Sequence, residues 1–285
     1  MASQQRVTVV TDSTSYLPAG LASRLGVRVV ALQVQLGDRS GSEGIDVSPA
    51  DVTAALRERV TVTTSRPAPA EFVQMYRSAL DAGASSVISI HLSAELSGTC
   101  DSARLAAAEF GGAVRVIDSR SAAMALGFGV LAAARAAAAG LEAEAVEHRA
   151  RETLNATKAI FYVDSLDWLR RGGRIGAAAA RFGTALSVKP LLHLSEGRIV
   201  PLEKVRTSTK AIARLVQLAV VAAGADRVDI AVQHLAAPDR ADSLTAQLRA
   251  ALPALGEVYQ SEVGAVVGAH VGPGLLGIVV AKSQC

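Results

Sequence analysis

Hydroxyl-bearing side chains stand where predicted strands of this chain end. Thr64 and Ser65 follow a β-branched run, and Ser97, Gly98 and Thr99 follow an apolar run and open a helical pattern. Free N–H groups at a helix start, together with hydroxyls, can bind an anion, and glycine permits its close approach. A helix start also needs caps, and Ser97 or Thr99 could accept hydrogen bonds from first-turn amides. The pattern therefore predicts an anion-binding turn, a helix cap, or one turn that serves both purposes.

His270 is a second candidate for binding an oxyanion. It lies in residues 262–274, where four glycines and a proline surround one imidazole. Such a segment lets the backbone approach a ligand, and the imidazole can donate a hydrogen bond to it. The alternative is a core histidine bonded to a neighbouring carbonyl group, and the sequence leaves both interpretations open.

Several familiar motifs lack the context that their chemistry requires. Residues 272–277 spell G-x-G-x-x-G but lead into a predicted strand, and 127–129 lie inside a predicted helix. The chain has no P-loop and no G-x-S-x-G elbow. Its five histidines and its cysteines, Cys100 and Cys285, lack metal-ligand spacing, and Asp12 has no second acid two residues later. We therefore expect no metal and no cofactor.

The order of the predicted elements indicates the fold class. Strand-like runs alternate with helical patterns up to residue 118, which is typical of a parallel sheet covered by helices. Ligands of such sheets bind outside the carboxyl ends of the strands. We predict an α/β protein with a parallel-sheet domain over residues 1–155 and a mixed-sheet domain over 156–285. Particular expectations are a helix over 17–25, one strand over 27–36, a loop over 37–44, a helix from the capping sequence 48–51, a helix over 97–110 and no helix between strands 257–261 and 275–281.

Composition excludes some classes of partner. The formal net charge is only +3, from 29 basic and 26 acidic residues, so it does not call for nucleic acid. The start of the chain has no signal-peptide pattern, and the most apolar stretch, 122–140, is interrupted by Arg135 and glycines. We expect a cytoplasmic protein with no nucleic acid partner and at most transient membrane contact.

Taken in order, the motifs of this chain resemble those of the DegV family of bacterial fatty-acid-binding proteins. The resemblance covers nearly the whole sequence. It rests on Thr11-Asp12-Ser13-Thr14, Thr64-Ser65-x-Pro67, Leu96-Ser97-Gly98-Thr99 with Ser102-Ala103, Asp118-Ser119, Gly172-Gly173-Arg174-Ile175, Lys204-Val205-Arg206 and the segment 262–274.

The resemblance implies a two-domain lipid carrier that is not catalytic alone. It would bury one long-chain fatty acid, hold its carboxylate between the domains, and present it to a separate fatty acid kinase related to dihydroxyacetone kinases, which forms an acyl phosphate. By motif, the carboxylate would be surrounded by Thr64, Ser65, Ser97, Gly98 and Thr99 and would accept a hydrogen bond from His270. Arg174 and Arg206 would meet the phosphate or the kinase, although an ordinary solvated basic face is the alternative for both arginines.

Two features of this chain depart from the family pattern. Residues 39–46 lack the aromatic and acidic pattern common in the family, and Cys100 stands where a larger residue is usual.

Two functions other than the lipid carrier remain open. The main rival is a dihydroxyacetone-kinase-like enzyme subunit that binds a small carbonyl compound covalently through His270. A regulatory ligand sensor is the third possibility. The sequence does not predict the acyl chain preference, the identity of the kinase or the oligomeric state.

Overall fold

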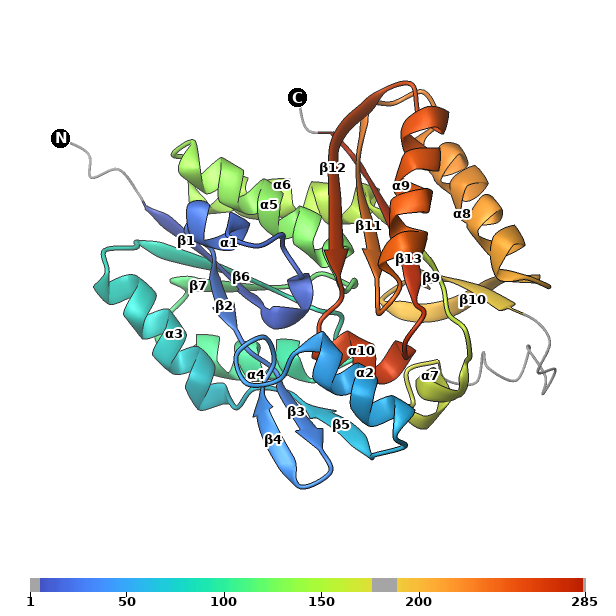
Figure 1. The fold of residues 1–285 in the computed structure, drawn as a ribbon. Helices are drawn as coiled ribbons and strands as arrows, with labels where there is room; N and C mark the ends of the chain where they lie inside the picture. The colour runs from blue at the N-terminus through green and yellow to red at the C-terminus, as the bar shows by residue number, and fades with distance from the viewer. Residues whose placement is uncertain (1–5, 176–188, 284–285) are drawn as a thin grey trace. The chain divides into compact units, whose positions relative to one another are not determined.

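The computed structural model describes residues 6–175 and 189–283, and it is a mixed α/β fold (Figure 1). The chain divides into two compact units. Unit 1 comprises residues 1–33 and 65–156, and unit 2 comprises residues 34–64 and 157–285. The sequence-based division after residue 155 places residues 34–64 in the first domain, whereas in the structure they group with the C-terminal part of the chain. Cys285 lies outside the described residues.

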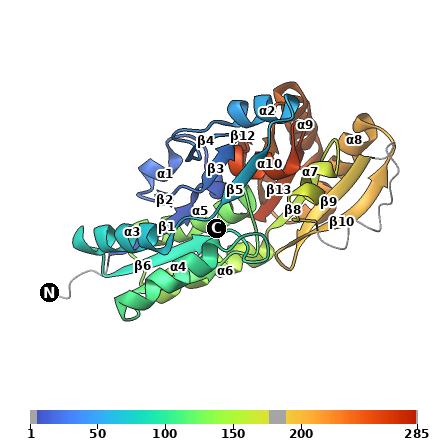
Figure 2. The ribbon, with the colours of Figure 1, turned by 90° about the horizontal axis from the view of Figure 1, so that it is seen from below.

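Unit 1 is built on a parallel sheet with strand order β2-β1-β6-β7. The strands are β1 (Val7–Asp12), β2 (Arg28–Val30), β6 (Ser86–His91) and β7 (Val114–Asp118). Helices α3 (Pro69–Asp81) and α4 (Thr99–Ala107) cover one face, and α5 (Met124–Ala138) and α6 (Ala143–Ala156) cover the other (Figures 1 and 2). All strands run the same way, so their carboxyl ends lie along one edge, where this class of sheet binds ligands.

The covering helices of unit 1 pack closely on the sheet. Phe72 and Tyr76 of α3 lie against Val10 and Val87 of the strands. On the opposite face, a Cβ at Gly129 of α5 would lie 2.5 Å from the Leu154 side chain of α6. Glycine at this position thus serves helix packing, as expected for residues 127–129, and the turn geometry of a nucleotide site is absent there.

Unit 2 contains a mixed sheet with strand order β10-β9-β8-β13-β11-β12. The strands are β8 (Lys158–Tyr162), β9 (Lys189–Ser195), β10 (Arg198–Val205), β11 (Val228–His234), β12 (Leu255–Glu262) and β13 (Leu276–Lys282). Strands β11 and β12 are parallel, and the other neighbouring strands are antiparallel. Residues 272–277 lead into β13, as the sequence predicted, so their glycines do not open a helix.

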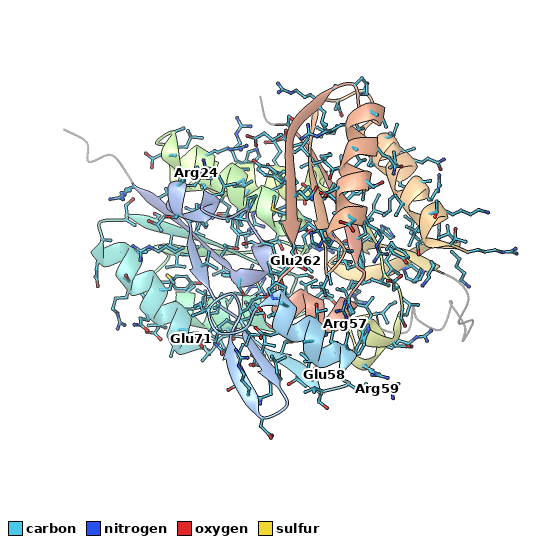
Figure 3. All side chains as sticks on the ribbon, viewed as in Figure 1. Arg24, Arg57, Glu58, Arg59, Glu71 and Glu262 are labelled. Atoms are coloured by element: carbon cyan, nitrogen blue, oxygen red, sulfur yellow. The ribbon has the colours of Figure 1, made fainter. Side chains whose placement is uncertain are left out.

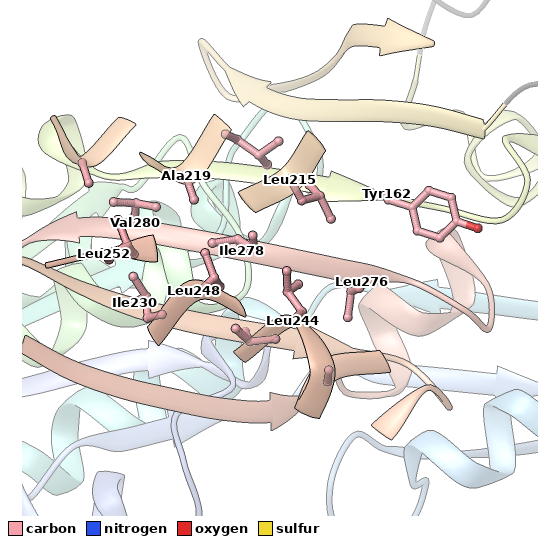
Figure 4. Packing of buried hydrophobic residues seen from close by; sticks show 14 of the residues in the cluster. Tyr162, Leu215, Ala219, Ile230, Leu244, Leu248, Leu252, Leu276, Ile278 and Val280 are labelled. Atoms are coloured by element: carbon pink, nitrogen blue, oxygen red, sulfur yellow. The ribbon is translucent and has the colours of Figure 1, made fainter. Parts of the chain in front are cut away.

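The core of unit 2 lies between this sheet and helices α8 (Ser208–Ala223) and α9 (Pro238–Ala251). Figure 4 shows Leu215 of α8 and Leu244 of α9 packed over Ile230 and Ile278 of the strands. Tyr162 closes one end of this cluster and directs its hydroxyl group out of it (Figure 4). Strand β11 is buried along its whole length, including its polar residues Asp229, Gln233 and His234, as expected for a central strand covered on both faces.

Residues 34–64 add a smaller sheet and a helix to unit 2. The sheet has strand order β4-β3-β5, with β3 (Gln33–Leu36), β4 (Arg39–Ser42) and β5 (Val62–Ser65), of which Gln33 and Ser65 fall in unit 1. Helix α2 (Pro49–Arg57) begins with the predicted capping box, in which Ser48 Oγ accepts from the Asp51 amide and Asp51 accepts from the Ser48 amide. Helix α2 packs against α10 (Ala265–Val271), a contact that explains the grouping of this segment with unit 2.

Local signals misplaced some elements. The helix expected over 17–25 is only α1 (Leu21–Arg24), because Gly20 adopts a φ of 72° and the preceding helical turn is a separate 3₁₀ turn, Ser13–Ser15. The strand expected over 27–36 is divided between β2 and β3, which belong to different sheets. Residues 37–44, expected as a loop, contain β4. The helix expected over 97–110 begins at Thr99 and ends in a 3₁₀ turn.

Helix α10 is the largest omission of the sequence-based analysis. No helix was expected between 261 and 275, where glycines stand at positions 264, 268 and 272, yet residues Ala265–Val271 are helical. A Cβ at Gly268 would lie 3.1 Å from the Leu235 side chain, so glycine allows this helix to pack closely on its neighbours. Tertiary packing thus outweighs the low helix propensity of glycine here.

No helix among the described residues is both long enough and apolar enough to cross a membrane.

Candidate functional site

Thr64 and His270 form a direct contact within unit 2. Thr64 lies at the end of β5 and His270 in the last turn of α10, and Thr64 Oγ1 is 2.9 Å from His270 Nε2. Burial, together with the nearby Arg174 guanidinium, lowers the pKa of His270 to about 4. The imidazole is therefore neutral near pH 7 and carries one N–H proton.

A count of protons shows what this pair can offer a ligand. The Thr64 hydroxyl and the neutral His270 ring have one donor proton each, and their mutual hydrogen bond uses only one of the two. If Thr64 donates to Nε2, the ring N–H remains; if Nε2 donates, the hydroxyl proton remains. In both tautomers one donor is left for an oxyanion, and no formal positive charge is needed on the ring.

Helix α7 (Asp167–Arg171) and the turn after it form the wall beside His270. A Cβ at Gly172 would lie 2.3 Å from His270 Nδ1, and a Cβ at Gly272 would lie 2.1 Å from Trp168 Cδ1. Glycine thus stands at both points where these segments meet: Gly172 faces the His270 ring, and Gly272 faces the Trp168 ring. Arg174 follows this turn and donates a short hydrogen bond from Nη1 to the Gly172 carbonyl group. The predicted residues Thr64, His270 and Arg174 are therefore brought together in unit 2.

Ser97, Gly98 and Thr99 form the start of α4 in unit 1. Ser97 Oγ accepts a hydrogen bond from the Thr99 amide at 3.3 Å and lies 2.9 Å from Thr99 Oγ1. Gly98 is the residue that precedes the helix, and it provides no side-chain cap. The cap interpretation is thus correct for Ser97. Its hydroxyl group has capacity beyond this bond, since a hydroxyl donates once and accepts twice.

Arg66 is a candidate that sequence reasoning missed. Its side chain lies across Gly98, where a Cβ would be 2.1 Å from Arg66 Nη1 and 2.9 Å from its Cδ. Arg66 is exposed, and no hydrogen bond or ion pair joins it to another residue in the described ranges 6–175 and 189–283. The signal in the sequence was the position of this basic residue, directly after the strand-end hydroxyl of Ser65 and before Pro67. The guanidinium thus lies against the backbone of Gly98, at the start of α4, where it can balance the charge of an anion.

Ser65 and Arg206 are less constrained. Ser65 ends β5 with an exposed side chain. Arg206 is also exposed and follows β10, whose last residue pairs with Lys189 at the start of β9. Neither residue has a described contact that assigns it a role.

Other polar strand ends of unit 1 are used inside the fold. Asp12 is buried and accepts hydrogen bonds from the Thr14 amide at 3.0 Å, the Leu92 amide at 2.9 Å and His91 Nδ1 at 3.0 Å. His91 Nε2 lies 2.6 Å from Ser89 Oγ. This Ser-His-Asp arrangement resembles a hydrolase triad, but all three side chains are fully buried, so the serine cannot meet a substrate.

Asp118 has a similar internal role at the end of β7. Its Oδ1 accepts from the amides of Ala94 and Arg120, at 3.2 and 2.9 Å.

Within the described residues, no cluster of three or more histidine, cysteine, aspartate or glutamate side chains could hold a metal ion.

Known proteins resemble this chain over its whole described length. The family model described as "Uncharacterised protein, DegV family" matches residues 6–283. A DegV domain-containing protein of Streptomyces coelicolor is 55% identical over 278 residues, covering 98% of this chain and 99% of the relative.

Solved structures agree with this assignment. A DegV family protein from Thermus thermophilus, described by its fatty acid binding, superposes with a TM-score of 0.92 at 37% identity, over 98% of this chain and 100% of that one. DegV from Bacillus subtilis, described as a fatty acid binding protein, gives a TM-score of 0.90 at 35% identity, with the same coverage. By sequence and by fold, this chain belongs to the DegV family.

Proposed function

We propose that this protein binds a long-chain fatty acid in a buried tunnel and presents its carboxylate to a separate fatty acid kinase. The observation that carries the proposal is the contact between Thr64 and a neutral His270, which leaves a donor for an oxyanion. The fatty acid binding described for the relatives from T. thermophilus and B. subtilis supports the same ligand class.

The proposed head-group contacts are donors rather than acceptors. Besides Thr64 and His270, they include Ser65, Ser97, the backbone at Gly98, and Thr99. Hydroxyl, imidazole and amide donors can hold a carboxylate without a full countercharge. Arg66 adds a cation against Gly98, which would partly balance the carboxylate charge as well.

The hydrocarbon tail would supply most of the affinity. Burying about fifteen methylenes at roughly 0.8 kcal/mol each gives about 12 kcal/mol before the costs of association. A carrier of this kind retains its ligand through the tail, while a modest head-group site sets its orientation. The carboxylate then remains available for transfer of a phosphoryl group, and the protein needs no cofactor and no catalysis of its own.

Lipid extraction from natively purified protein tests the binding part of the proposal. We expect about one fatty acid per chain by mass spectrometry. His270→Ala together with Ser97→Ala should lower retention, whereas the matched control His148→Ala, at an exposed position of α6, should leave it unchanged. Protein that is empty and also fails to bind added fatty acids would contradict the proposal.

The kinase part of the proposal has a separate test. Arg174 and Arg206 are proposed to meet the phosphate or the kinase, so Arg206→Ala should retain fatty acid but lower acyl phosphate formation with the kinase. Arg249→Ala, another exposed arginine of unit 2, is the control. Equal loss of binding and phosphorylation in Arg206→Ala would mean that Arg206 serves the ligand and not the transfer step.

A second function is favoured by the neutral state of His270, since an unprotonated imidazole is also a nucleophile. A dihydroxyacetone-kinase-like subunit would add its imidazole nitrogen to the carbonyl carbon of a small ketone. Intact-mass analysis after incubation with dihydroxyacetone distinguishes the two functions. A mass increase that is absent in His270→Ala supports the enzyme, and an unmodified chain that binds fatty acid supports the carrier.

A further inference from the structure

Helix α10, which carries His270, receives its N-terminal cap from a distant part of the chain. Gly264 precedes the helix and has no side chain to offer the first-turn amides. Glu43 takes this role, because its Oε1 accepts a hydrogen bond from the Val266 amide at 2.7 Å. Glu43 is only 4% exposed, so this is a buried, charge-assisted hydrogen bond at the positive end of a helix.

The turn between β4 and α2 is constructed to hold Glu43 in this position. The Ser42 carbonyl group accepts from the amides of residues 45, 46 and 47, and the Ser42 amide donates to Asp46 Oδ2 at 2.9 Å. Glu43 itself forms a β-bridge with Val47. A Cβ at Gly41 would lie 2.5 Å from Asp46 Cβ, so the turn closes tightly only with glycine there.

The same segment, 34–64, reaches α10 at its other end as well. Thr64 Oγ1 contacts His270 in the last turn, and Gly268, in the middle of the helix, lies against α2, with Val52 Cγ1 3.8 Å from the position of a Cβ. Helix α10 is thus contacted by one segment at its first turn, its middle and its last turn.

The ends of the 262–274 segment are fixed independently of Glu43. Glu262, at the end of β12 (Figure 3), accepts from the Ala236 amide at 2.8 Å, and the Gly274 amide donates to the Leu235 carbonyl group at 2.8 Å. These bonds determine where the chain enters and leaves the helix. Between these two fixed ends, the Glu43 carboxylate accepts a hydrogen bond from the Val266 amide in the first turn of α10, so it determines how the helix is seated.

We propose that Glu43 is a positioning residue for His270. Its carboxylate fixes the first turn of α10, and the seven-residue helix passes that constraint to the imidazole at its other end. The inference rests on the proposed fatty acid binding for its functional consequence. It also gives the turn at 37–46 an internal role, in place of one in partner docking.

Four variants test this role: Glu43→Ala, Glu43→Gln, His270→Ala and the double variant of Glu43→Ala with His270→Ala. Glu58→Ala is the matched control, since Glu58 belongs to the same segment but is exposed at the end of α2, between Arg57 and Arg59 (Figure 3). Two quantities are measured: the titration of the His270 imidazole by NMR in lipid-free protein, and the Kd for a fluorescent long-chain fatty acid.

We expect Glu43→Ala to move the His270 titration from about 4 toward 6.5, because a loosened helix exposes the ring. Fatty acid binding should weaken about tenfold, which corresponds to one charge-assisted hydrogen bond. Glu43→Gln keeps an acceptor oxygen and should restore most of the affinity. In the His270→Ala background, Glu43→Ala should cause no further loss.

An unchanged His270 titration in folded Glu43→Ala, or the same tenfold loss in the His270→Ala background, would overturn the proposal. If Glu43→Ala does not fold, Glu43→Asp decides, because shortening the side chain draws the carboxylate away from Val266 and should shift the titration in the same direction. If His270→Ala leaves fatty acid binding intact, the head-group assignment fails, while the titration still decides the role of Glu43.

Discussion

Replacement of Gly172 by alanine adds one methyl group against the proposed head-group site and removes no binding atom. The new Cβ would lie 2.3 Å from His270 Nδ1, 3.2 Å from its Cε1 and 3.3 Å from the Trp168 carbonyl oxygen. Gly172 has a φ of −73°, so its backbone accepts alanine without strain. The severe steric conflict is therefore with the imidazole ring, and the contact with the Trp168 carbonyl oxygen is only slightly tight.

The size of the effect follows from these distances. A carbon and a nitrogen atom in ordinary contact are about 3.4 Å apart or more, so the ring must move by about 1 Å. Such a shift breaks or strongly weakens the 2.9 Å bond between His270 Nε2 and Thr64 Oγ1. Loss of one net hydrogen bond, about 1 kcal/mol, predicts fatty acid binding weakened five- to tenfold. Overpacking should also lower the free energy of unfolding by about 1–3 kcal/mol.

Displacement of a fluorescent fatty acid gives the Kd, and urea unfolding gives the stability. The informative comparison is Gly172→Ala combined with His270→Ala, because the space left by the imidazole accommodates the new methyl group. In that background the added methyl should cost neither affinity nor stability. Gly172→Ala that binds fatty acid as tightly as the parent protein, although His270→Ala does not, would refute the reasoning.

Three further predictions concern stability and reactivity. Because the folded pKa of His270 is about 4 and its ordinary value is 6.5, the unfolded chain binds a proton first, so stability is lost as the pH falls from about 6.5 to 4, by about 2–3 kcal/mol. His270→Asn should lack this slope in urea titrations, and identical slopes would contradict it. Asp12→Ala leaves four buried donors without their acceptor and should lower the free energy of unfolding by about 3 kcal/mol or more, whereas a loss under 1 kcal/mol would show that water replaces the carboxylate. Burial raises the pKa of Cys100 to about 12, so this thiol should resist iodoacetamide at pH 8 until the chain unfolds, and rapid labelling of native protein would contradict its enclosure.

The sequence was sufficient for the fold class because its signals were local. Alternating strand and helix patterns predicted the parallel sheet of unit 1, and the capping sequence at 48–51 marked the start of α2 correctly. Thr64 and His270 could each be selected by type and position. Their contact spans 206 residues of sequence, and it was foreseen only through the resemblance to a family.

The membership of residues 34–64 in unit 2 could not be predicted in the same way. It depends on the packing of α2 on α10 and on the bond from Glu43 to Val266, which joins residues 223 positions apart. Helix α10 itself was hidden by its glycines, which lower helix propensity but permit the close packing at Gly268. Both features arise from tertiary contacts that leave no periodic pattern in the sequence.

Polar residues at strand ends divide by the chemistry that their bonds leave available. Asp12 and Asp118 are acceptors, and their carboxylates already accept from backbone amides, so they satisfy the fold and would repel a fatty acid carboxylate. Thr64 and Ser97 carry hydroxyls whose partners are other donor-bearing side chains, His270 and Thr99. Each group of such a pair has a proton to donate, and their mutual hydrogen bond uses only one of the two. One proton therefore stays available to a ligand, whichever group donates. A carboxylate ligand needs such a spare donor proton. Asp, Ser and Thr are all ordinary helix caps, so their presence at strand ends does not show which of them keep one.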